Sequence, residues 1–275
     1  MSARTTQVIL VAGALILFVL LFIAPKIAPQ KVEGNNESGT KQLVTADNNA
    51  NLEVYITLAK KNLEPNQAKI FSKLLSENKN DSLVVFWDKL KRPDIAAVYV
   101  EQNAIRKSDS AVVWFKAGDR YYYSIQFTQD KTELPLLYQC AMRCYSKGLK
   151  LDPKNVDAKI MLASCFVEGT QNPMQGITLL KDIEKTDSNN VKLQLSFAFF
   201  SVKSGQLDKA ITRFKKVLAV DSNYIEAYLH MADAYEQQGE TNETITVLEK
   251  YKLKTTDVTA KVEINKYIEQ LRIKN

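Results

Sequence analysis

The chain has 275 residues, of which 45% are hydrophobic and 25% are charged. This composition excludes a globally disordered protein and permits one or two domains with sizeable cores. Lysine and arginine number 37 against 31 acidic residues, which gives a formal net charge of +6. The basic residues are scattered, and no segment combines a basic stripe with stacking aromatic residues, so we expect no nucleic-acid partner.

The first apolar segment is long enough to enter a membrane. Residues 8–24 (VILVAGALILFVLLFIA) carry no charge, and as a helix they are about long enough to cross the hydrocarbon core of a bilayer. The alternative is a cleaved secretory signal, because Arg4 precedes the run and small residues follow it. Proline follows both candidate cleavage residues, Ala24 and Ala28, which disfavours cleavage. We expect a single-pass membrane protein whose anchor is residues 1–30, in contact with the lipid bilayer through residues 8–24.

The charges around this segment do not decide its orientation. Arg4 and the terminal amine precede it, whereas Lys26, Lys31 and Lys41 follow it. Signal anchors usually translocate the chain that follows them, so we expect the body of the protein on the periplasmic side of a bacterial inner membrane. Residues 31–50 are polar and offer nothing to bury, which predicts a flexible stalk.

The rest of the chain has a helical pattern. Apolar residues recur at spacings of three and four, with Gly, Asn, Asp and Pro between the apolar stretches, so the pattern predicts an all-α fold. Residues 51–76 are expected to form an opening hairpin around Pro65, a residue suited to the first turn of a helix. A shift of about 34 residues aligns three segments that end one hairpin and begin the next. These segments are LDPKN at 151–155, TDSNN at 186–190 and VDSNY at 220–224.

The aligned segments share an aspartate, at positions 152, 187 and 221. A side-chain oxygen at this place can accept hydrogen bonds from the free amides at the start of the following helix. We therefore interpret Asp152, Asp187 and Asp221 as helix caps and not as catalytic carboxylates.

One unit, residues 111–155, carries a highly specific set of residues. Its signature residues are Trp114, Ala117, Gly118, Tyr121, Ala141, Tyr145, Gly148 and Pro153. In this it resembles the tetratricopeptide repeat (TPR) family, whose hairpin carries an aromatic residue, a pair ending in a small residue, a tyrosine, an alanine, a bulky residue and a closing proline. Gly118 and Pro153 are 35 residues apart, where a standard repeat leaves about 24, so an insertion at 126–134 is expected to lengthen the turn.

The resemblance covers roughly residues 77–273, with the repeat array at 77–255, and implies an α-solenoid of stacked hairpins, preceded by the single transmembrane helix. Small residues recur at Gly118, Ala163, Ala198 and Ala232, where helix backbones are expected to approach closely. Stacked repeats need a terminal cap. Residues 256–275 are expected to form that capping helix, and its expected inward residues are Val258, Val262, Ile268 and Leu271.

No catalytic motif is present. The sequence lacks a Gly-rich phosphate loop, a nucleophile elbow, an HExxH motif and a histidine near a candidate nucleophile. The three cysteines, Cys140, Cys144 and Cys165, are interpreted as small buried hydrophobic residues, and one bridge to Cys165 would require an oxidising compartment. Zinc would need a fourth ligand, and the single histidine, His230, lies far along the chain. We expect a protein that is not an enzyme and that holds no cofactor or metal.

The resemblance implies a protein or peptide partner, read by first-helix residues that line a groove. The residues at these positions are Phe115, Asp119, Tyr122, Ile160, Leu195, Phe199, Leu229 and Asp233. The Lys and Asn of the family's clamp for terminal carboxylates are missing, and an apolar groove suits an amphipathic helix or the protein's own cap. We expect a scaffold or adaptor displayed at a membrane. The alternative is a permanent structural subunit or assembly factor of a membrane or envelope complex.

Overall fold

The structure is a computed structural model that describes residues 47–274. The expected anchor at 1–30 lies outside the described residues, and so does the stalk up to residue 46. The first described helix begins at Asp47, inside the segment predicted to be stalk. Among the described residues, no helix is both long enough and apolar enough to cross a membrane.

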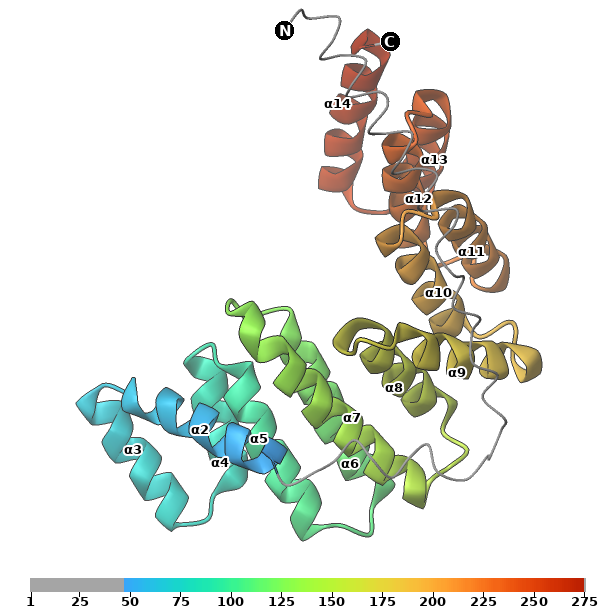
Figure 1. Ribbon diagram of the computed structural model, residues 1–275. Coiled ribbons are helices and arrows are strands. Elements are labelled where there is room, and N and C mark those ends of the chain that lie inside the picture. Colours follow the sequence, from blue (N-terminus) through green and yellow to red (C-terminus); the bar gives the residue numbers. More distant parts are fainter. Residues whose placement is uncertain (1–46, 275) are drawn as a thin grey trace, which may run out of the picture. The chain divides into compact units, whose positions relative to one another are not determined.

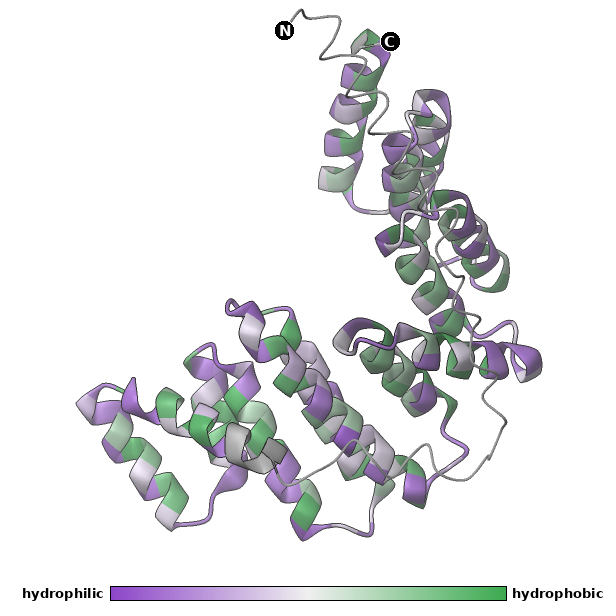
Figure 2. Ribbon diagram, viewed as in Figure 1, coloured by the Kyte–Doolittle hydropathy of each residue, from purple (hydrophilic) through white to green (hydrophobic). Residues whose placement is uncertain are grey.

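The described residues form 13 α-helices and one 3-10 helix, without a strand, which confirms the predicted all-α class (Figure 1). In chain order these elements are α2 (Asp47–Lys61), α3 (Pro65–Ser76), α4 (Asn80–Lys89), α5 (Pro93–Arg106), α6 (Ala111–Ile125), η1 (Lys131–Glu133), α7 (Leu134–Leu151), α8 (Val156–Gly169), α9 (Pro173–Thr186), α10 (Val191–Lys203), α11 (Leu207–Val220), α12 (Glu226–Gln237), α13 (Thr241–Lys254) and α14 (Val258–Lys274). Hydrophobic and hydrophilic residues are interleaved along the same helices, as amphipathic packing requires (Figure 2).

Consecutive helices from α4 to α13 pair into hairpins. In each pair, such as α6 with α7 or α10 with α11, the two helices pack against each other. The second helix of a hairpin also packs on the first helix of the next one, as α5 does on α6, α7 on α8 and α11 on α12. This succession is a TPR-like array of helical hairpins, in which each unit shares its core with its neighbours.

The opening segment differs from a simple hairpin. Helix α3 packs on α4, whereas α2 packs beside α7. The hydroxyl group of Tyr55 on α2 donates hydrogen bonds to Asp94 on α5 and, at 3.0 Å, to Glu133 on η1. Tyr55 and Ala59 are both buried in the core that α5, α6 and α7 share. Distant partners along the chain therefore fix the position of α2.

Close approach of helix backbones explains the small residues of the hairpins. A Cβ atom added to Gly118 would lie 2.8 Å from the ring of Tyr145. A Cβ atom at Gly176 would lie 2.3 Å from the backbone carbonyl oxygen of Ala163 on the partner helix. A side-chain ring can shift to make room, but the carbonyl oxygen of a packed helix cannot. Of these two glycines, Gly176 therefore tolerates a larger residue less well.

The ends of the helices show that the repeated aspartates have a different role from the predicted one. Asp152 and Asp187 do not cap the following helix; they lie at the C-terminal ends of α7 and α9. The true N-caps are Asn155, whose side chain accepts from the amide of Ala158, and Asn190 in the next repeat. Each aspartate accepts from the side chain of the capping asparagine, at 3.3 Å for the first pair and 3.0 Å for the second. The aspartate therefore orients the cap instead of providing it.

The third copy of this motif lacks the capping asparagine. Tyr224 occupies the equivalent position, and α12 begins without a side-chain cap. Asp221 ends α11 and accepts a hydrogen bond from the amide of Asn223 at 3.0 Å. Tyr224 packs against the C-terminal core, so hydrophobic burial replaces the cap at this junction.

The predicted cap, α14, covers the array with a different face from the one expected. Ile268 and Leu271 are buried as predicted, but Val258 is 73% exposed and Val262 is 48% exposed. A helix turns about 100° per residue, so these valines lie to one side of the stripe of Ile264, Ile268 and Leu271 and not within it. The expectation that Val258 and Val262 point inward was therefore wrong.

The Gly176→Ala variant tests the close approach of α8 and α9. In a free helix this change would stabilise by about 0.5–1 kcal/mol. Here the added methyl group meets a backbone oxygen, so we expect a net loss of about 1–3 kcal/mol in the free energy of unfolding. Urea denaturation followed by circular dichroism measures it. Thr178→Ala, at an exposed position of the same helix, is the control; equal stability of both variants would contradict the packing.

Candidate partner-binding surfaces

The first-helix residues of the N-terminal repeats are engaged in packing. Phe115 is half-buried against Gly148 on the facing helix. Asp119 is exposed and accepts a hydrogen bond from Tyr145 at 2.7 Å, and Tyr122 donates to Glu168 at 2.6 Å. Ile160 is only 1% exposed and belongs to the core, so it does not line a surface. These four candidates hold neighbouring helices together.

The candidates on α10 and α12 are more accessible. Leu195 and Leu229 are half-buried and pack against the C-terminal core. Phe199 is 42% exposed, and Asp233 is exposed on α12, the first helix of the next hairpin. The carboxylate of Asp233 accepts a hydrogen bond from Gln237 at 2.9 Å. Of the eight candidates, Phe199 is the large hydrophobic residue most available to a partner.

The ring of Phe199 packs against two other aromatic rings. Its ring centroid lies 5.5 Å from that of Phe214 and 4.9 Å from that of His230, both in edge-on geometry. His230 stacks on Phe214 at 5.3 Å. Burial lowers the pKa of His230 below its ordinary value of 6.5, against the opposing influence of Asp233 and Glu226. The exposed ring therefore packs on two aromatic rings, and at neutral pH the lowered pKa favours the uncharged form of His230.

From the sequence, His230 was considered only as a fourth zinc ligand and was not connected to Phe199. The two residues are on different hairpins, and spacing along one helix cannot show that they touch. His230 directly follows Leu229, a predicted groove residue, and this neighbourhood could have suggested that His230 belongs to the same surface.

The single histidine of the chain allows this packing to be tested directly. We expect NMR titration of ¹³C-labelled His230 to give a pKa below 6.5, because the protonated ring would lose hydration. Phe199→Ala exposes the imidazole, so its pKa should rise toward 6.5. A value at or above 6.5 in the unsubstituted protein would contradict burial against the two phenylalanines.

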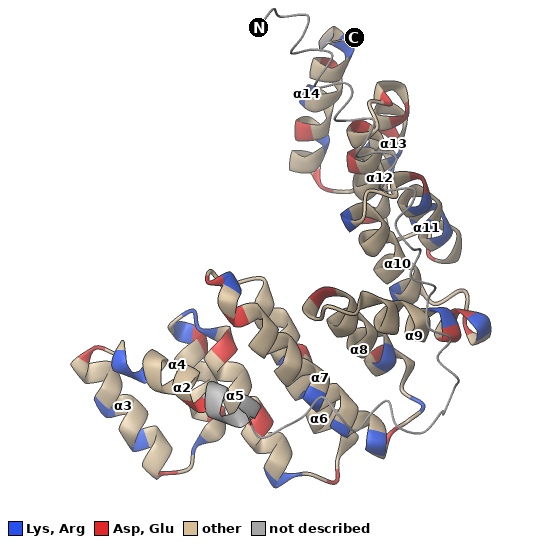
Figure 3. Cartoon of the chain, viewed as in Figure 1, with Lys and Arg blue, Asp and Glu red and all other residues tan. Residues whose placement is uncertain are grey.

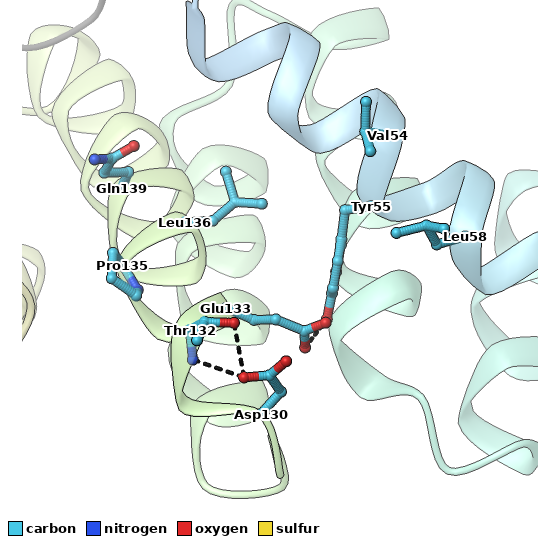
Figure 4. Close-up of a pocket in the computed structure, with 9 residues that line it drawn as sticks. All are labelled: Val54, Tyr55, Leu58, Asp130, Thr132, Glu133, Pro135, Leu136 and Gln139. Atoms are coloured by element: carbon cyan, nitrogen blue, oxygen red, sulfur yellow. Dashed lines mark hydrogen bonds between the residues drawn. The ribbon is translucent and has the colours of Figure 1, made fainter.

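A second candidate surface is a cleft between α2 and α7. Its volume is about 450 Å³, and Val54, Tyr55, Leu58, Asp130, Thr132, Glu133, Pro135, Leu136 and Gln139 line it. Tyr55 points across the cleft toward Glu133 (Figure 4). Asp130 accepts hydrogen bonds from the amide of Thr132 at 2.9 Å and from its hydroxyl group at 2.7 Å, which lowers the pKa of Asp130. Burial raises the pKa of Glu133, although its hydrogen bond with Tyr55 opposes this shift.

The predicted insertion at 126–134 forms one side of this cleft, because it contains η1. None of the residues that line the cleft was identified from the sequence. The insertion was the one feature of the sequence that pointed to this region. Its partner, α2, lies about 80 residues earlier in the chain, and such a distant pairing leaves no periodic pattern from which it could be predicted.

The three cysteines are free and buried. Burial raises the pKa of Cys140 to about 11 and also raises those of Cys144 and Cys165. Thiols held in this form are poor nucleophiles and metal ligands. In residues 47–274, no group of three or more His, Cys, Asp or Glu side chains is placed to hold a metal ion.

Basic and acidic side chains both occur along the whole described array (Figure 3).

Comparison with known proteins agrees with the hairpin repeat. A model of the TPR repeat matches residues 202–239, which include the end of α10, all of α11 and α12. No curated protein matches the chain.

Several solved structures are similar at low identity. YrrB, described as a TPR protein with an unusual peptide-binding site, is 19% identical, with a TM-score of 0.43 over 71% of this chain and 97% of that chain. TTC0263, a thermophilic TPR protein of Thermus thermophilus, is 19% identical, with a TM-score of 0.49 over 69% and 97%. PilW, a type IV pilus biogenesis factor, is 14% identical, with a TM-score of 0.48 over 70% and 92%. These superpositions are too loose to assign a function.

Proposed function

We propose that this protein is a non-enzymatic scaffold that docks a partner protein or peptide on the first-helix surface of α10 and α12. The exposed ring of Phe199 carries this proposal. Large aromatic residues with a rigid base and an open face are typical anchors of protein interfaces, because they bury much apolar area with little loss of side-chain entropy.

The packing around Phe199 defines what would bind there. Phe214 and His230 support one side of the ring, and Leu195 and Leu229 are half-buried in the same C-terminal core. The free face of the ring is apolar, so the partner should place an apolar side chain on it. An amphipathic helix or a hydrophobic segment meets this requirement.

Phe199→Asp should abolish co-purification of the partner, because a carboxylate would be desolvated at the centre of the interface. The matched control is Val220→Asp. Val220 is 43% exposed, nearly the same as Phe199, but lies on the second helix α11. Helix content by circular dichroism should be unchanged in both variants. A folded Phe199→Asp variant that retains its partner would contradict the proposed surface, and equal loss of the partner in both variants would show that the surface is not specific.

We also propose that residues 8–24 anchor the scaffold in a bacterial inner membrane, with the repeats in the periplasm. This rests on the uncharged, span-length sequence and on the prolines after Ala24 and Ala28.

Alkaline extraction tests the anchor. The full chain should stay in the membrane pellet, whereas a variant lacking residues 1–30 should be released. Protease added to spheroplasts should degrade the repeats, because they would face the periplasm. A mature protein that begins after Ala24 or Ala28 and washes off with alkali would contradict the anchor.

A further inference from the structure

The turn between α6 and α7 is unlike the other turns of the array. It spans residues 126–133, whereas the turns before α9, α11 and α13 span 170–172, 204–206 and 238–240. The additional residues form η1 and bring Asp130, Thr132 and Glu133 against α2. Short turns suffice to close the other hairpins, so the stacking of repeats does not require this longer one.

The cleft that results has apolar walls. Val54 and Leu58 lie one helical turn apart on α2 and are 59% and 55% exposed. Leu136 and Pro135 of α7 line the opposite side (Figure 4). An occupant with an aliphatic part would cover apolar surface of these four side chains, and burial of apolar surface favours binding.

The lining of the cleft is negatively charged. Arg92 pairs with Asp94 at 2.7 Å and neutralises that carboxylate. Glu133 and Asp130 line the cleft, and neither forms an ion pair within residues 47–274. Glu133 accepts one hydrogen bond, from Tyr55, and is partly desolvated. The side chains that line the cleft therefore include two acidic groups and no basic group.

We propose that this cleft binds a basic side chain, with an adjacent apolar residue, from a segment of a partner protein. Apolar walls that lead to a carboxylate fit a side chain with an aliphatic stem and a positively charged head, as in arginine and lysine. Arginine fits better, because its planar guanidinium group can donate to Glu133 and Asp130 together. A volume of about 450 Å³ exceeds one side chain and leaves room for the neighbouring apolar residue. This site is separate from the surface around Phe199.

The test uses the full chain in detergent micelles and two fluorescein-labelled peptides measured by anisotropy. One peptide carries an arginine between two leucines, and the other carries citrulline, which has the same shape without the charge. We expect the arginine peptide to bind at least about tenfold more tightly. Glu133→Gln keeps an acceptor for Tyr55 but removes the charge, so it should remove this preference. Leu58→Gln should weaken both peptides.

The matched control is Glu243→Gln, which removes an exposed carboxylate from α13 and should leave both affinities unchanged. If Glu133→Gln lowers the melting temperature, Asp130→Asn replaces it as the charge-removing variant, because its amide oxygen still accepts from Thr132. Equal binding of the two peptides would overturn the proposal. So would absence of binding, or a preference for arginine that survives removal of the carboxylate in a folded variant.

Discussion

The close approach of paired helices is the constraint on which the array depends. Two backbones can come this near only where one helix has a residue with little or no side chain. Gly176, which lies beside the carbonyl oxygen of Ala163, is such a residue. The large residues then fill the space between hairpins, so no hairpin buries its apolar face alone. Packing therefore determines both the core and the side chains that remain exposed on the first helices.

Buried polar contacts also join neighbouring helices of the array. Glu101 is buried and accepts from Arg143 at 2.7 and 2.9 Å and from Tyr121 at 2.7 Å, which joins α5, α6 and α7. Near the small central core, the fully buried Gln194 accepts from Arg213 at 2.8 Å. Breaking such a pair would leave a buried polar group unsatisfied, so these residues fix the relative register of neighbouring helices.

The sequence was sufficient to predict what depends on local pattern. The helices, the hairpin pairing from α4 onward, the insertion and the small residues all follow from periodicity and repeat spacing. The docking of α2 could not be predicted, because Tyr55 meets Asp94 and Glu133 at separations of 39 and 78 residues. The capping role was assigned to Asp152 instead of Asn155, because either side chain can accept from a free amide and only the helix start distinguishes them.

Hydrogen–deuterium exchange of the purified complex, compared with the free protein, tests the central claim most directly. A partner seated on Phe199 should slow exchange in α10 and α12 more than in α11 and α13, because residues of the first helices form the proposed surface. Protection confined to α11 and α13, or the absence of protection in α10 and α12, would contradict the account.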